Sequence, residues 1–166
     1  MKKHNHFSLA KTLPGLLPWL WALLALASCG RRQVLCYTFQ ATPQEGWEQH
    51  NALAFPMDSV EQAGLYELSV GVRTTYAYPY QSLWLQVTTR MDSATCPRVD
   101  TLVLRVTDGQ GHLQGQGMSL FQLLQPLRRE HLQAGQRGVV EVRHLMRTAL
   151  LPGVSDVGVR LRRVDR

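Results

Sequence analysis

The sequence predicts an all-β fold, a single antiparallel β-sandwich of about seven or eight strands behind a cleaved signal peptide. Three observations support this prediction. Apolar and polar residues alternate with period two in most segments beyond residue 64, which is the pattern of strands that bury one face. Turn signals that contain Gly or Pro separate these segments. Successive strands without intervening helices, in a mature chain of fewer than 140 residues, favour two packed sheets in one domain.

The N-terminal segment has the composition of a signal peptide. All three lysines of the chain precede residue 12, and residues 13–27 form an apolar run shorter than the roughly 20 residues of a membrane-spanning helix. The run ends in Leu-Ala-Ser-Cys at residues 26–29, which resembles the cleavage site of bacterial lipoproteins. We therefore predict cleavage before Cys29, with a diacylglycerol on its thiol and a fatty acid such as palmitate on the freed amine. The alternative is an ordinary secretory signal followed by an unrelated cysteine.

Three segments follow from this cleavage: the lipoprotein signal peptide over residues 1–28, a lipid-anchored linker over 29–33 and the β-sandwich domain over 34–166. The whole chain has a formal charge of +6, but the mature chain keeps 15 arginines against 12 acidic residues, a net +3. Nucleic acid is excluded as a partner because an exported domain meets none. No acidic tract of the kind that often precedes surface display follows Cys29. The predicted location is therefore the outer membrane, with the lipid anchor at its periplasmic face.

The first predicted strands lie between residues 34 and 73. Residues 34–40 are rich in β-forming residues, and residues 52–57 add a short strand before Asp58. In segment 65–73 the apolar residues share one face: Tyr66, Leu68, Val70 and Val72. The polar residues of this segment share the opposite face: Glu67, Ser69 and Arg73.

The rest of the chain repeats the alternation in four segments: 83–91, 102–107, 140–143 and 156–162. Asp-Gly at 108–109 and Pro-Gly at 152–153 mark turns. Residues 119–125 differ, because their leucines fall at helical spacing behind a potential Ser119 cap, and Pro126 would stop a helix. This segment is either a short helix or an irregular edge strand.

The sequence predicts no enzyme, metal site or cofactor. Residues 109–117 are rich in glycine, but Gln114 breaks the G-x-G-x-x-G pattern, so we interpret them as a hairpin with glycine-permitted bulges. The segment around Ser155 lacks the final glycine of a G-x-S-x-G motif. The histidines of the mature chain have no metal-ligand spacing: His50, His112, His131 and His144. A hydrolase with two carboxylates from distant strands stays open as a third hypothesis, because no spacing nominates such a pair.

The densest aromatic cluster of the mature chain consists of Tyr76, Tyr78, Tyr80 and Trp84. In a strand, the three tyrosines would share one face and form a platform for sugar rings or a partner protein. Alternatively, Pro79 breaks the strand and the rings cover the edge of the core, each hydroxyl with a hydrogen-bond partner. We keep all four as candidate partner-binding residues.

Two further sets of residues each allow two interpretations. Cys36 and Cys96 remain beside the lipidated Cys29, and in an oxidising compartment they either form a disulfide across a long loop or stay apart. The arginines near the C-terminus are most simply interpreted as a solvated strand face and tail. The alternative is that they contact acidic headgroups or an acidic protein. These arginines are Arg160, Arg162, Arg163 and Arg166.

A series of short motifs suggests a family. In chain order they are Tyr78-Pro79-Tyr80-x-x-Leu83-x-Leu85, Asp100-Thr101-Leu102, Leu113-x-Gly115-x-Gly117, Met146-Arg147 and Gly153-Val154-x-Asp156-Val157-Gly158-Val159-Arg160. Their order and spacing, behind a lipoprotein signal, resemble the GldH family of gliding-motility lipoproteins. The resemblance is clearest over residues 66–161.

The resemblance implies a small envelope lipoprotein that is needed for surface gliding. The gliding machinery of this family is linked to the type IX secretion system. It brings no catalytic residue and no cofactor. The resulting hypothesis is a non-enzymatic lipoprotein that assembles with or stabilises envelope proteins of this machinery, while Cys29 holds it at the membrane. The alternative is a β-sandwich module that binds envelope glycan or polysaccharide through the same aromatic residues. Neither hypothesis requires a small-molecule substrate.

Overall fold

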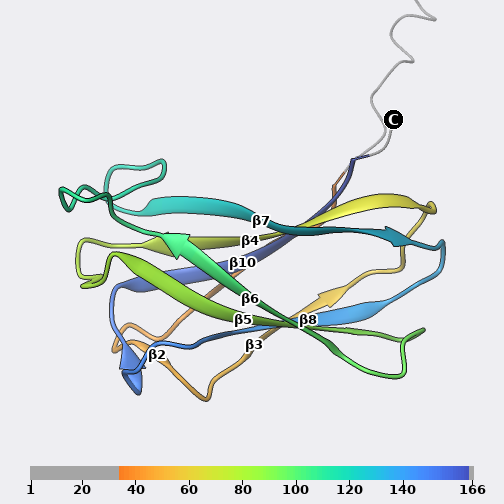
Figure 1. Cartoon of the computed structure of the whole chain (residues 1–166), viewed down its shortest axis with the longest axis horizontal. Helices are drawn as coiled ribbons and strands as arrows, with labels where there is room; N and C mark the ends of the chain where they lie inside the picture. Colours follow the sequence, from red (N-terminus) through yellow and green to blue (C-terminus); the bar gives the residue numbers. More distant parts are fainter. Residues whose placement is uncertain (1–33, 165–166) are drawn as a thin grey trace, which may run out of the picture. The chain divides into compact units, whose positions relative to one another are not determined.

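The computed structural model describes residues 34–164, and every regular element within them is a strand (Figure 1). The strands are β1 (Val34–Ala41), β2 (Trp47–Glu48), β3 (Leu53–Met57), β4 (Gly64–Thr74), β5 (Ser82–Met91), β6 (Arg98–Arg105), β7 (Phe121–Leu132), β8 (Gly138–His144), β9 (Leu150–Leu151) and β10 (Val154–Arg163). Within this range no helix is long and apolar enough to cross a membrane. The predicted signal peptide, the linker with Cys29, and Arg166 lie outside the described residues.

The strands form a sandwich of two four-stranded antiparallel sheets, so the predicted fold class is confirmed. The first sheet has the order β1-β10-β4-β7 and the second has the order β3-β8-β5-β6, while β2 and β9 pair separately. Figure 1 shows β7, β4 and β10 in one layer and β5, β8 and β3 in the other. At one edge β1 contacts β3, where the Gln40 amide donates to the Ala54 carbonyl at 2.6 Å. At the other edge β7 contacts β6.

The hydrophobic core lies between the two sheets, because the period-two alternation directs one face of each strand inward. The predicted apolar face of β4 is confirmed, since Tyr66, Leu68, Val70 and Val72 are all buried. The largest fully buried side chains from other segments include Trp47, Phe55, Leu83, Leu85, Leu151 and Leu161. The opposite face of β4 is buried as well at Glu67 and Ser69, because β4 is a central strand that neighbouring side chains cover.

Residues 119–125 do not form a helix, because β7 begins at Phe121 and runs through Pro126 to Leu132. The strand alternative is therefore confirmed, and Pro126 does not end the element. Pro126 pairs with Ser69 next to a register shift at which Leu127 is the extra residue of β7, and β7 is an edge strand. A proline is tolerated at an edge or a bulge because its missing N–H need not break a ladder hydrogen bond.

The glycine-rich stretch folds as a short irregular hairpin, as predicted. The Asp108 carboxylate accepts the backbone N–H of Gln110 at 2.8 Å and of His112 at 2.9 Å. The His112 N–H is the main cause that holds the pKa of Asp108 below its ordinary value. A bridge between Thr107 and Leu113 closes the hairpin.

The disulfide between Cys36 and Cys96 is not formed, and both thiols are free. Cys36 lies on β1, at one edge of the first sheet, whereas Cys96 precedes β6, which faces the opposite edge strand β7. Three strand spacings of about 4.8 Å separate the two edges, far more than a disulfide spans. Of the two alternatives, the structure supports two separate cysteines.

Candidate functional site

Residues 75–81 are a loop between β4 and β5, so the three tyrosines do not form a platform on a strand. The structure supports the other interpretation, in which the strand is broken near Pro79 and the rings cover the edge of the core. Tyr78 is buried, and its hydroxyl donates to the Ser82 carbonyl at 3.0 Å. Burial raises the pKa of Tyr78. Tyr76 is exposed and packs edge-on against Phe121, whereas Tyr80 packs edge-on against Tyr78. Tyr78 therefore belongs to the core, and only Tyr76 and Tyr80 remain on the surface.

Tyr80 and Trp84 line an open hollow together with Leu145, Met146 and Arg147. We call this set the Trp84 hollow. Trp84 points outward from β5 and is 47% exposed, and Tyr80 is 40% exposed. The Leu145 N–H donates to the Trp84 carbonyl at 2.8 Å, which joins the two sides of the hollow. The result is an accessible apolar and aromatic surface with one guanidinium at its rim.

Three residues of the Trp84 hollow were not predicted as site residues, namely Leu145, Met146 and Arg147. They follow directly on β8, which ends at His144 beside β5. The Met-Arg pair at 146–147 is one of the motifs that suggested the family. This motif was the only signal seen in the sequence that pointed to these residues.

The Trp84 hollow lies toward one end of the sandwich. The loop before β5 is at this end, and so are the exposed side chains of Tyr76, Met118 and Leu120. Figure 1 shows the β4–β5 and β6–β7 connections at the opposite end from the last residues of β10. The last residues of β10 pair with the start of β1, where the described chain begins. Because β4 has 11 residues, about 35 Å separate the two ends.

A buried histidine lies directly behind the Trp84 hollow. His144 is fully buried, its Nε2–H donates to the Trp47 carbonyl at 3.0 Å, and its ring packs edge-on against the Trp47 indole. Its Nδ1 is also buried and has no hydrogen-bond partner in the described part of the chain. Burial lowers the pKa of His144, and the hydrogen bond to Trp47 opposes this effect only in part. The folded domain therefore favours the neutral imidazole.

This burial predicts a loss of stability in mild acid. A histidine whose pKa is lower in the folded state takes up its proton first in the unfolded chain, so stability is lost as the pH falls below about 6.5. We expect the urea midpoint to fall between pH 7.5 and pH 5.5. His144→Gln, which keeps a donor for the Trp47 carbonyl, should remove most of this dependence. His131→Gln, at an exposed histidine, should leave it in place, and equal slopes for both variants would show that His144 is not responsible.

The polar face of β4 carries an arginine cluster. Glu67 is approached by Arg129 at 3.0 Å, by Arg162 at 3.1 Å and by Arg160 at 3.8 Å. Burial raises the pKa of Glu67, but the hydrogen bonds and charges of Arg129 and Arg162 outweigh it and hold the pKa below its ordinary value. Arg160 and Arg162 therefore do not form the freely solvated face that the sequence favoured. We call these four residues the Glu67 cluster.

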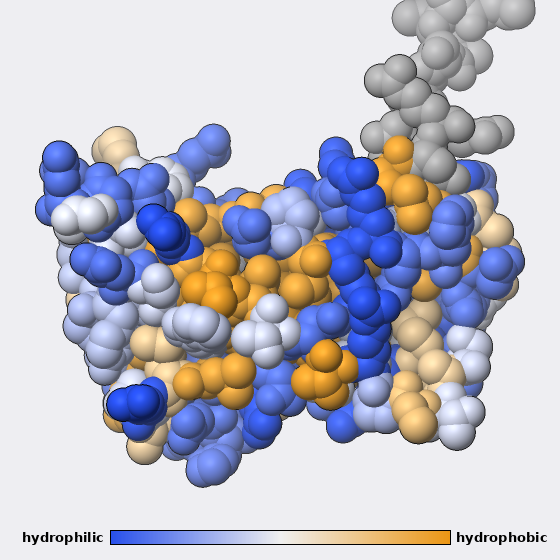
Figure 2. All heavy atoms as spheres, in the orientation of Figure 1, coloured by the Kyte–Doolittle hydropathy of each residue, from blue (hydrophilic) through white to orange (hydrophobic). Residues whose placement is uncertain are grey.

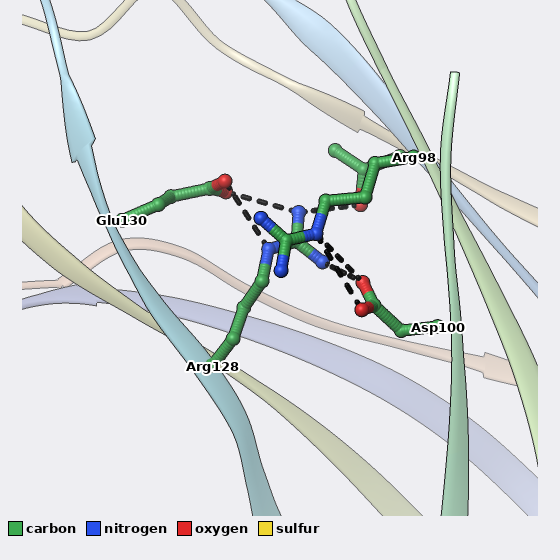
Figure 3. Close-up of polar contacts among 5 residues, drawn as sticks. Arg98, Asp100, Arg128 and Glu130 are labelled. Carbon is green, nitrogen blue, oxygen red and sulfur yellow. Dashed lines mark hydrogen bonds and ion pairs between the residues drawn. The ribbon is translucent and has the colours of Figure 1, made fainter.

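A second ion cluster joins the two sheets where β7 faces β6 (Figure 3). Arg128 points from β7 to Asp100 on β6 and also donates to Glu130 at 3.1 Å and to the Thr89 hydroxyl at 3.0 Å. Arg98 joins from β6 through Asp100 at 3.5 Å. Figure 2 shows apolar side chains between the sheets on one side of the molecule, beside a column of hydrophilic residues. We call Arg98, Asp100, Arg128 and Glu130 the Arg128 cluster, and it lies at the edge of the core where β7 faces β6.

The described residues contain no group of three or more His, Cys, Asp or Glu side chains placed to hold a metal ion.

Comparison with known proteins places the chain in a family. The family model described as GldH lipoprotein matches residues 34–161. The gliding motility lipoprotein GldH of Flavobacterium johnsoniae is 24% identical over an alignment of 153 residues that covers 88% of this chain and 94% of that protein.

Two solved structures show a partial likeness. Eiger TNF from S. frugiperda has 11% identity and a TM-score of 0.37, over 81% of this chain and 96% of that chain. A family GH115 4-O-methyl-α-glucuronidase with specificity for decorated arabinogalactans has 16% identity and a TM-score of 0.38, over 82% of this chain and 18% of that chain.

The β-sandwich and the match to a lipoprotein family define a small membrane-anchored protein of the bacterial envelope. The family model covers most of the chain, including nearly all of the sandwich. The chain belongs to the GldH lipoprotein family. The resemblance seen in the sequence motifs is thereby confirmed.

Proposed function

We propose that this protein is a non-enzymatic envelope lipoprotein that supports the gliding motility machinery and the linked type IX secretion system. It does so by assembling with, or stabilising, envelope proteins of that machinery. Membership of the GldH lipoprotein family supports the gliding role. The acylated Cys29 anchors the domain in the outer membrane at its periplasmic face, which confines the search for partners to two dimensions.

The Trp84 hollow is the observation that carries the docking role. Tryptophan and tyrosine are enriched among the few residues that supply most binding energy in protein interfaces, provided that they are exposed in the free protein and buried in the complex. Trp84 and Tyr80 meet the first condition, and Leu145 and Met146 continue the apolar surface. The hollow lies toward the end of the sandwich remote from the start of β1, where the described chain begins.

The combined substitution Tyr80→Ala and Trp84→Ala should reduce partner capture at least about 30-fold, because loss of such anchors removes about 2 kcal/mol or more. The measurement is co-purification of the tagged, lipidated protein from a gently solubilised envelope, with identification of the captured proteins. Both side chains are about half exposed, so the thermal midpoint should change little.

The matched control is Val99→Ala, which removes an exposed apolar side chain from β6 at the opposite end of the sandwich. It should leave capture unchanged. Capture of gliding or secretion components that survives the double substitution would show that another surface docks. Saturable binding of soluble envelope polysaccharide, with a change in Trp84 fluorescence, would instead favour the glycan-binding alternative, since Trp84 and Tyr80 are placed to stack on a sugar ring.

A further inference from the structure

The Glu67 cluster leaves positive charge on the outer face of the first sheet. Three guanidinium groups, those of Arg129, Arg160 and Arg162, share one carboxylate, so the cluster has a net charge of +2. The Glu67 side chain is nearly buried beneath them, whereas the Arg129 side chain is 63% exposed. Each guanidinium has five N–H donors, and its planar fork matches two oxygens of a phosphate.

Aromatic side chains lie beside these arginines on the same face. Tyr37 is exposed and pairs across the strands with Arg160. The Phe39 ring lies over the backbone of Gly71 and Gly158, where an added Cβ would come within 2.8 Å and 2.7 Å of it. The Arg73 guanidinium lies 4.1 Å from the centre of that ring. Arginine with tyrosine is a combination that suits the headgroup region of a membrane.

The face is also close to the predicted point of anchoring. Val34, the first residue of β1, pairs with Arg162 of the cluster. Five residues lead from Cys29 to Val34, and an extended chain of that length spans at most about 18 Å. An anchor at Cys29 therefore holds the cluster within reach of the lipid headgroups, where a basic side chain gains about 1 kcal/mol if the lipids are anionic, a preference of about fivefold.

We propose that the outer face of the first sheet binds the anionic phospholipid headgroups of the membrane that carries the anchor. The sandwich then rests on the membrane through β1, β10, β4 and β7, and Trp84, on the outer face of the second sheet, is directed away from the lipid. This inference depends on the lipid anchor in the proposed function, but not on the identity of the partner.

The test uses the lipidated protein in liposomes of phosphatidylcholine, with or without phosphatidylglycerol, that contain a headgroup spin-labelled lipid. Tyr37→Trp combined with Trp84→Phe moves the exposed indole to the proposed contact face, while the unsubstituted protein carries its exposed indole at Trp84. The fully buried Trp47 is common to both proteins and gives the same background fluorescence. We expect quenching of the indole at position 37 in the anionic liposomes only, and little quenching of Trp84. Arg129→Gln should lower the ratio of docked to undocked protein about fivefold. Arg162 still pairs with Glu67 in this variant, so the fold is kept.

Arg105→Gln is the matched control, because it removes an exposed arginine from β6 in the second sheet. It should leave quenching unchanged. Equal quenching in neutral and anionic liposomes, or equal effects of the two arginine variants, would overturn the proposal. Release by millimolar inorganic phosphate would overturn it too, because it would identify a site for a free anion. If the protein does not sediment with liposomes at all, the lipid anchor in the proposed function is wrong. This result is distinguishable from failure of the headgroup contact, in which the protein sediments but the indole at position 37 is not quenched.

Discussion

Replacing Arg128 with alanine should lower the free energy of unfolding by about 3 kcal/mol, because it removes the buried partner of Glu130 and leaves Asp100 with only the exposed Arg98. The Arg128 side chain is only 8% exposed and contacts Asp100 and Glu130. The contact with Asp100 joins β7 of the first sheet to β6 of the second, the contact with Glu130 lies within β7, and a third contact reaches Thr89 on β5. Urea unfolding at neutral pH measures the effect.

Arg98→Ala is the control for this prediction. Arg98 contacts the same Asp100, but its side chain is 59% exposed. Exposed ion pairs contribute little, so the loss should stay below about 1 kcal/mol. A similar loss for both variants would mean that Arg128 contributes only as a surface charge and does not hold the two sheets together.

The sequence predicted the fold well because period-two alternation directly reports which side chains face a core. The inward face of β4 was read correctly from Tyr66 to Val72, and the other long strands followed the same rule. The opposite face of β4 shows the limit of the method. Glu67 and Ser69 are polar, yet both are buried, because arginines from adjacent strands cover them. Alternation identifies two faces but does not report what covers the second one.

Local helical spacing was a weaker guide than topology in β7. The leucines around residue 123 fit a short helix, and Pro126 fits its end. The structure places this segment at a sheet edge, where a proline beside a register shift breaks no essential hydrogen bond. Only the order of the strands reveals an edge, and strand order depends on contacts between residues far apart in sequence.

The Trp84 hollow could be predicted only in part. Tyr80 and Trp84 were recognised as aromatic residues close in sequence, but their partners Leu145 and Met146 come from the segment after β8. The hollow exists because β5 and β8 are neighbours in the second sheet, so Leu145 reaches the Trp84 carbonyl. The sequence left Tyr78 between a surface platform and the edge of the core, because composition does not show which rings a loop turns inward.

Gly153→Ala should be among the most damaging single changes, with a loss of about 3 kcal/mol or more. Gly153 is in the turn before β10 and has a φ of +77°, a region that costs other residues about 1–2 kcal/mol. A Cβ there would lie 2.2 Å from the backbone nitrogen of Tyr78, and such overlap adds about 1–3 kcal/mol. The Gly153 carbonyl also accepts the N–H of Thr75 at 2.9 Å. The substitution therefore displaces the loop that holds Tyr78 in the core and Tyr80 in the Trp84 hollow.

Gly135→Ala separates the cost of backbone strain from the cost of Cβ overlap. Gly135 has a φ of +88°, but an added Cβ there meets no atom within 4 Å. This variant should lose only the backbone contribution of about 1–2 kcal/mol, as measured by urea unfolding. Of the two glycines, only Gly153 lies against the loop of residues 75–81. Gly153→Ala should therefore weaken partner capture at the Trp84 hollow as well as lower stability. Gly135→Ala should leave capture intact. If the two variants lose the same stability and both keep full capture, the close approach of the turn to Tyr78 does not position the Trp84 hollow.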